Sequence, residues 1–139
     1  MAQHNGEIMP ALSNYAETTV INLFLKGVNA TAPTQWWLAL YTTNPTAADT
    51  GAEVSFTGGS AYARQPLTFG TPLGGLISST GELDFPVAGT NWGTIGWAGI
   101  RDAATAGHLL FYGPLVTSRF ISAGDVLKFL IGNVSVTVS

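Results

Sequence analysis

The chain has 139 residues and a formal net charge of −3, and only 9% of its residues are Asp, Glu, Lys or Arg. Globular domains usually carry about 25% charged residues, so small polar side chains or other protein must cover much of this surface. Its five basic residues cannot form the positively charged surface that nucleic-acid binding requires. Cysteine is absent, and no apolar stretch reaches the roughly 18–20 residues that span a bilayer. We expect a subunit of a protein assembly, with neither nucleic acid nor membrane as its partner.

One helix is predicted near the N-terminus, over residues 14–26. Asn14 and Glu17 have the spacing of a capping box, and Gly27 suits the position after the last helical turn. A helix that covers the core is the first interpretation, and a helix that binds a partner is the alternative. The first interpretation places four side chains at helical spacing against the sheet: Tyr15, Val20, Leu23 and Phe24.

Short apolar or alternating runs, separated by turn residues, fill most of the remaining chain. The strongest are residues 94–100 and 108–112, which the small-residue connection 101–107 joins into a predicted central hairpin. Further strands are expected over 35–42, 61–69, 76–78, 83–85, 115–117, 126–131 and 133–138. This pattern predicts a mainly β fold, an antiparallel, jelly-roll-like β-sandwich with one N-terminal α-helix. Residues 13–139 are expected to form this single domain, and residues 1–12 an N-terminal arm.

The connection over residues 43–60 is longer than ordinary loops, which makes it the best candidate for a segment that reaches a neighbouring protein. Arg64 lies on a predicted strand and, if buried, must pair with a carboxylate within the fold or across a subunit boundary. Arg101 and Asp102 are expected to form a local surface pair at the tip of the hairpin or to hold its turn. The tryptophans are predicted to anchor the core or an interface, with a sugar-stacking platform as the alternative: Trp36, Trp37, Trp92 and Trp97.

No catalytic or metal-binding set can be assembled from the sequence. The two histidines, His4 and His108, have no second histidine nearby, whereas a zinc site needs three or four ligands. Glu82 and Asp84 would share a strand face and could serve a glycosidase, but two acids beside a turn are more often simply solvated. We therefore expect no enzymatic activity, no cofactor and no metal.

Four stretches and a closing alternating strand, in this order, resemble a family of small virion proteins of tailed bacteriophages, described as tail-fibre-like or head-decoration proteins. The four stretches are LSNYAE (12–17), LALYTTNPT (38–46), GGSAYARQPLTFG (58–70) and WGTIGWAGIRDAATAGHLLFYGPL (92–115). The resemblance covers residues 11–139 and implies a non-enzymatic, β-rich and oligomeric structural protein. It implies no catalytic residues and does not decide the location on the virion.

The leading functional prediction is a capsid decoration protein, a homotrimer on the capsid surface that binds between subunits of the major capsid protein and stabilises the shell. The alternative is a tail-fibre or tail-tip module that binds a host surface glycan. Capsid contact is predicted for the arm and the long loop, at His4, Ile8, Met9, Pro10, Asp49, Glu53 and Phe56. Contact within the oligomer is predicted at Arg64, Trp97, Arg101 and Tyr112.

Overall fold

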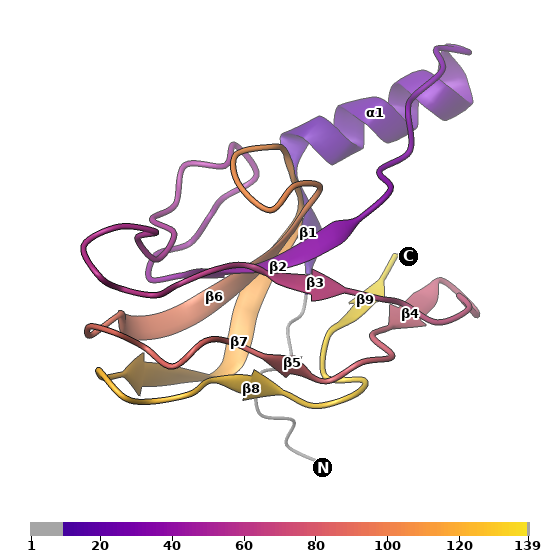
Figure 1. Cartoon of the computed structure of the whole chain (residues 1–139). Coiled ribbons are helices and arrows are strands. Elements are labelled where there is room, and N and C mark those ends of the chain that lie inside the picture. Colours follow the sequence, from indigo (N-terminus) through magenta and orange to yellow (C-terminus); the bar gives the residue numbers. More distant parts are fainter. Residues whose placement is uncertain (1–9, 139) are drawn as a thin grey trace.

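The computed structural model describes residues 10–138 as three antiparallel sheets and one helix (Figure 1). In chain order the elements are β1 (Ala11–Leu12), α1 (Asn14–Leu25), β2 (Trp36–Tyr41), β3 (Gln65–Leu67), β4 (Leu76–Ser78), β5 (Leu83–Asp84), β6 (Gly93–Arg101), β7 (Leu109–Ile121), β8 (Lys128–Phe129) and β9 (Ser135–Thr137). The helix and the two strands of the predicted hairpin are confirmed to within a few residues at most ends. Within the described part of the chain, no helix is long and apolar enough to cross a membrane.

A five-stranded sheet with the order β1-β7-β6-β2-β3 forms the larger layer of the fold. The β6–β7 hairpin lies at its centre, with β2 antiparallel to β6 on one side and β1 antiparallel to β7 on the other. Ala11 and Leu12, predicted as the end of the arm, pair with Tyr112 and Phe111 and so belong to this sheet.

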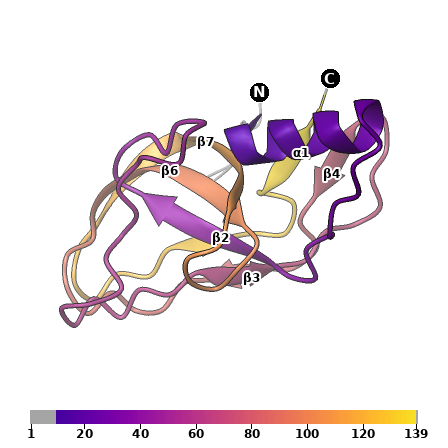
Figure 2. The same cartoon turned by 90° about the horizontal axis from the view of Figure 1, so that it is seen from above.

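Two small sheets, β4-β9 and β5-β8, pack against this layer and enclose the core (Figures 1 and 2). The large sheet contributes Leu38, Leu40 and Ile95, all fully buried, and the small sheets contribute Phe129 and Val136. Burying these alternating side chains between two layers removes apolar surface from water, which is the main favourable term of folding. The predicted β-sandwich with one N-terminal helix is therefore confirmed.

Several strand boundaries differ from the predictions for local reasons. A separate strand was expected after Gly113-Pro114, but β7 runs on without a break, with Pro114 opposite Trp97 at a register shift in the hairpin. Of the expected strand 61–69, Gln65–Leu67 forms β3 and Phe69 makes only an isolated bridge with Ser79, while Ala61 has a φ of 62° and turns the chain before the strand. The expected strand 133–138 is shorter, since β9 ends at Thr137 and Val138 is 52% exposed.

The start of α1 also differs by one residue from the predicted capping box. Ser13, not Asn14, is the N-cap, since its hydroxyl accepts a hydrogen bond from the backbone N–H of Ala16 at 3.1 Å. The end agrees with the prediction: Lys26 is the C-cap, and Gly27 follows with the positive φ of 66° that ends many helices.

Candidate functional site

Two buried arginines fix the long loop of residues 43–60 to the rest of the chain. Arg64 donates from Nε and Nη2 to the two carboxylate oxygens of Glu53, both at 2.8 Å. Arg101 donates from Nη1 and Nη2 to the two oxygens of Asp49, also at 2.8 Å. Bidentate pairs of this kind combine charge with fixed geometry. We call Asp49, Glu53, Arg64 and Arg101 the arginine cluster.

The same two guanidinium groups hold the turn between β6 and β7. Arg64 Nη1 donates to the carbonyl oxygens of Ala103 and Ala106 at 2.8 and 2.9 Å. Arg101 donates to the carbonyl oxygens of Ala106 and Gly107 at 3.3 and 3.0 Å. The arginine cluster therefore joins two loops that are distant in sequence. The long loop, expected to reach a neighbour, directs two of its carboxylates into its own fold.

These contacts decide between the two partners proposed for Arg64, since its carboxylate lies within the chain. The expected surface pair of Arg101 with Asp102 is wrong, whereas the alternative, that these residues hold the hairpin turn, is confirmed. Arg101 is buried and donates to Asp49 and Tyr41, because the loop brings Asp49 over the end of β6. Asp102 instead accepts hydrogen bonds from His108.

Two titratable groups in and beside the arginine cluster, Tyr62 and Arg101, have pKa values raised above their ordinary values. Burial, followed by the negative charge of Glu53, raises the pKa of Tyr62 far above its ordinary value. Burial lowers the pKa of Arg101, but its hydrogen bonds to Asp49 and Tyr41 outweigh this, and the net shift is upward. The Tyr62 hydroxyl donates to Glu53 at 2.7 Å and accepts from the Leu40 N–H at 2.9 Å. This arrangement suits a structural network rather than proton transfer near neutral pH.

A second group of side chains anchors the first turn of α1. The ring of Tyr15 stacks on the ring of His108, with centroids 3.9 Å apart and planes 4° from parallel. His108 Nδ1 lies 2.9 Å from Asp102 Oδ2, and its backbone N–H donates to the other oxygen of Asp102 at 2.7 Å. Burial raises the pKa of Asp102, but the hydrogen bonds from His108 outweigh it, and the pKa lies below its usual range. The helix is thus held at its base.

Beyond this base, α1 does not pack on the sheet. It contacts only β1 and β7 among the described elements, and Ala16 is its one buried residue. Figure 1 shows the helix projecting away from the sheet. The prediction that Tyr15, Val20, Leu23 and Phe24 lie against the sheet is therefore wrong, since they are 42–75% exposed. The helix is held to the sheet at one end only, so no strand packs against its apolar side chains beyond that end.

The exposed apolar surface of α1 is large for a helix in a folded soluble domain. Full burial of one Val, Leu, Ile or Phe side chain is worth about 1.5–3 kcal/mol, so leaving several exposed forgoes several kcal/mol. Contiguous exposed apolar surface of this kind marks interaction sites in soluble proteins. The side chains on and just after α1 that are 42–78% exposed are Tyr15, Val20, Ile21, Leu23, Phe24, Leu25 and Val28.

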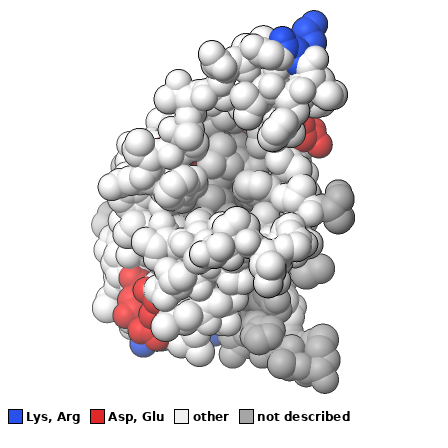
Figure 3. Space-filling model, turned by 90° about the vertical axis from the view of Figure 1, so that its right-hand side faces the viewer, with Lys and Arg blue, Asp and Glu red and all other residues white. Residues whose placement is uncertain are grey.

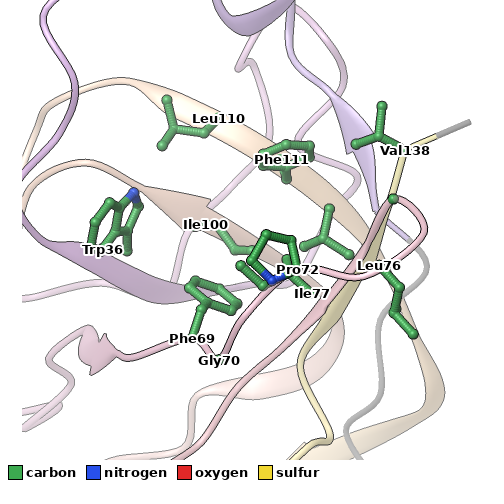
Figure 4. Close-up of a pocket in the computed structure, with 12 residues that line it drawn as sticks. Trp36, Phe69, Gly70, Pro72, Leu76, Ile77, Ile100, Leu110, Phe111 and Val138 are labelled. Atoms are coloured by element: carbon green, nitrogen blue, oxygen red, sulfur yellow. The ribbon is translucent and has the colours of Figure 1, made fainter.

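An apolar hollow of ≈ 530 Å³ lies between the large sheet and the β4-β9 pair (Figure 4). Aromatic side chains from three segments face it, namely Trp36 at the start of β2, Phe69 after β3 and Phe111 on β7. Figure 3 shows this face hollowed at its centre, with no charged side chain around the hollow. The complete lining is Trp36, Phe69, Gly70, Pro72, Gly75, Leu76, Ile77, Ile100, Leu110, Phe111, Val136 and Val138. Sequence reasoning missed this site because its lining comes from distant parts of the chain.

The four tryptophans have different roles. Trp92 is a core residue, only 6% exposed, and its Nε1 donates to the carbonyl oxygen of Ser60 at 2.9 Å. Trp36 lines the apolar hollow and also a smaller neighbouring hollow with Phe69, Thr34, Gln35 and Thr68. Trp37 and Trp97 are half-buried in β2 and β6. Trp36 is thus placed beside a hollow where a ligand could stack on it.

The acidic residues considered for catalysis form exposed ion pairs with one lysine. Glu82 and Asp84 both lie 3.7 Å from Lys128 Nζ, and all three side chains are about half exposed. Ion pairs this exposed contribute little to stability. Within residues 10–138, no group of three or more His, Asp or Glu side chains could hold a metal ion.

Most of the predicted contact residues that the structure describes lie in or against the arginine cluster. His4, Ile8 and Met9 lie outside the described residues, and Pro10 is partly buried at their border. Asp49, Glu53, Arg64 and Arg101 form the arginine cluster, and the ring of Phe56 packs on Tyr62 and beneath Arg64. Trp97 and Tyr112 are half-buried in the central hairpin. Their contact roles stay predictions.

Comparison with known proteins identifies the family. A family model described as podophage GP4 fiber I protein gp80 matches residues 11–137. The chain belongs to this family. No match was found among curated proteins.

Membership in the gp80 family confirms the resemblance to structural proteins of bacteriophage virions. Because the description of the family names a fibre protein, the match supports the tail-fibre alternative. It does not support the predicted capsid decoration protein. The chain is accordingly a fibre protein of a phage virion.

Proposed function

We propose that this chain is a non-catalytic subunit of the virion fibre and that α1 attaches it to a neighbouring subunit. One observation carries the proposal: the only helix of the described chain leaves its apolar side chains exposed, up to 78% at Leu25. Such a helix is stabilised once a partner covers it. The low charge content agrees with a surface that other protein covers.

The fibre is also the proposed location, in place of the capsid surface and its major capsid protein. The arginine cluster supports a mechanical role, because it braces the long loop of residues 43–60 against the turn of the central hairpin without presenting reactive groups. Labelling this protein on intact particles tests the location, with label on fibres expected and label on the head surface contradicting it.

The test of the attachment role is incorporation into virions. Phe24→Lys with Leu25→Lys removes the apolar face, and lysine preserves helix propensity and suits a helix C-terminus. The matched control places lysines at two other exposed apolar residues, Val87 (57%) and Val126 (45%). The α1 variant should fold but be depleted from purified particles, while the control is incorporated normally. Normal incorporation of a folded α1 variant would refute the attachment role.

A second candidate function, binding of a host glycan, has one observation in its favour. In the smaller hollow, Trp36 and Phe69 offer aromatic faces beside the polar side chains of Gln35 and Thr68, a combination that suits a sugar ring. Titration of the protein with host surface polysaccharide, followed by tryptophan fluorescence, tests it. Binding that is lost in Gln35→Ala with Thr68→Val supports the candidate, and equal binding by that variant removes it.

A further inference from the structure

The exposed helix and the apolar hollow lie on the same side of the molecule. Both views of the ribbon show α1 projecting on the side that carries β4 and β9, which form one wall of the hollow (Figures 1 and 2). Yet α1 contributes no residue to the lining, and it contacts only β1 and β7 among the described elements. The helix therefore does not fill the hollow of its own chain.

The most exposed side chains of α1 form one stripe. Ile21, Phe24 and Leu25 have the i, i+3, i+4 spacing of a single helix face and are 53%, 75% and 78% exposed. Ala16, which is buried, lies on the opposite side of the helix. The stripe thus points away from the sheet that holds the base of α1.

The stripe and the hollow match in size and in polarity. A cavity of roughly 150 Å³ holds one benzene molecule, so a hollow of ≈ 530 Å³ has room for about three side chains of that size. The stripe offers three: Ile21, Phe24 and Leu25. No lining residue is charged, and between Glu17 and Lys26 the helix carries no charge either, so nothing opposes close contact.

We infer that α1 of one copy docks in the apolar hollow of a second copy of this chain. This inference rests on the proposed function, in which α1 is the attachment element, and it names the partner. Because every copy has one α1 helix and one hollow, each hollow in an assembly can hold the helix of another copy. Such a helix-in-groove contact closes into a ring or a mutual pair, or continues along a fibre, depending on the rotation between copies.

Cross-linking between separate copies tests this contact. The chain has no cysteine, so each single variant carries one thiol. Leu25→Cys places it on the stripe, and Leu76→Cys places it on the lining of the hollow. The two variants, carrying different tags, are mixed under mild oxidation. The control mixture replaces Leu76→Cys by Val87→Cys, an exposed residue outside the hollow.

A mixed disulfide between the Leu25→Cys and Leu76→Cys copies is expected in about tenfold excess over the control mixture, because the bond requires Cα atoms within about 7 Å. Equal yields in both mixtures, or dominant pairing of Leu25→Cys with itself, would overturn the inference. Sedimentation supplies a second measurement on the unmodified protein. It should self-associate as concentration rises, and Phe24→Lys with Leu25→Lys should stay monomeric; a wild-type monomer at all concentrations overturns the inference.

The two proposals can fail separately. If the wild type stays monomeric but the lysine variant is missing from particles, α1 binds another virion protein and the inference of a second copy is wrong. If the cross-link forms specifically but the lysine variant enters particles normally, the copies dock as inferred, and the proposed attachment role is wrong.

Discussion

Arg64 and Arg101 share one acceptor, the carbonyl oxygen of Ala106, at 2.9 Å from Arg64 Nη1 and 3.3 Å from Arg101 Nε. Ala106 adopts a φ of 51°, which is uncommon for a residue other than glycine. A costly backbone conformation persists where the surroundings hold it. Two buried arginine side chains that donate to one carbonyl oxygen therefore hold the turn of the central hairpin in place. Their ion pairs with Glu53 and Asp49 hold the long loop in place as well.

Glu53→Gln should destabilise the fold by about 3 kcal/mol, because it leaves Arg64 buried without a counter-charge. The Arg64 and Glu53 side chains are only 3% and 15% exposed, so water cannot replace the lost partner. The free energy of unfolding in urea measures the effect. The control is Glu82→Gln, whose partner Lys128 is 48% exposed, and it should change that energy by less than about 0.5 kcal/mol. Similar losses in the two variants would contradict the buried pair.

Tyr62→Phe should cost about 1–3 kcal/mol of unfolding free energy, because the Leu40 N–H loses its acceptor inside the core. Hydrogen exchange at the Leu40 amide should accelerate in the same variant. Tyr112→Phe is the control, since Tyr112 is half-buried as a residue and its hydroxyl makes no hydrogen bond with any other described residue. An unchanged exchange rate at Leu40 would show that the tyrosine hydroxyl does not hold that amide.

Acid should weaken the anchor of α1. The pKa of Asp102 is lowered in the folded protein, so its contribution to stability is present above its unfolded pKa of about 3.9. That contribution is lost as the pH falls through the lower, folded value. Between about pH 6 and pH 2, the wild type should therefore lose more unfolding free energy than Asp102→Asn does. Parallel losses in the two proteins, measured by thermal unfolding, would argue against this role.

Two phenylalanines should respond in opposite ways to truncation. Phe129→Ala, at a fully buried position, should cost about 3–5 kcal/mol of unfolding free energy. Phe24→Ala should change it by less than about 0.5 kcal/mol in the isolated monomer, because Phe24 is 75% exposed and alanine favours helix. Urea unfolding at low protein concentration separates them. A large cost at Phe24 would mean that α1 packs on its own domain.

The sequence by itself determined the class of fold and the central hairpin. Apolar residues that alternate with polar ones indicate a strand, because side chains point to opposite faces of a strand in turn. Gly27 ends a helix because glycine readily adopts a positive φ. Both signals are local in the sequence. The same local reasoning identified the apolar spacing of α1. It also required a carboxylate partner for Arg64, because a buried charge must be paired whatever the fold.

Only the tertiary structure decided which surfaces those elements meet. An apolar helix face has the same spacing whether it covers a core or projects from it, and α1 projects because it is held at its first turn, through Asn14, Tyr15 and Ala16. The pairing of Arg101 with Asp49 rather than with Asp102 depends on how a long loop folds back. The hollow is likewise made from distant segments such as Phe69 and Phe111. Contacts between residues far apart in sequence depend on the packing of the whole chain, which local patterns do not encode.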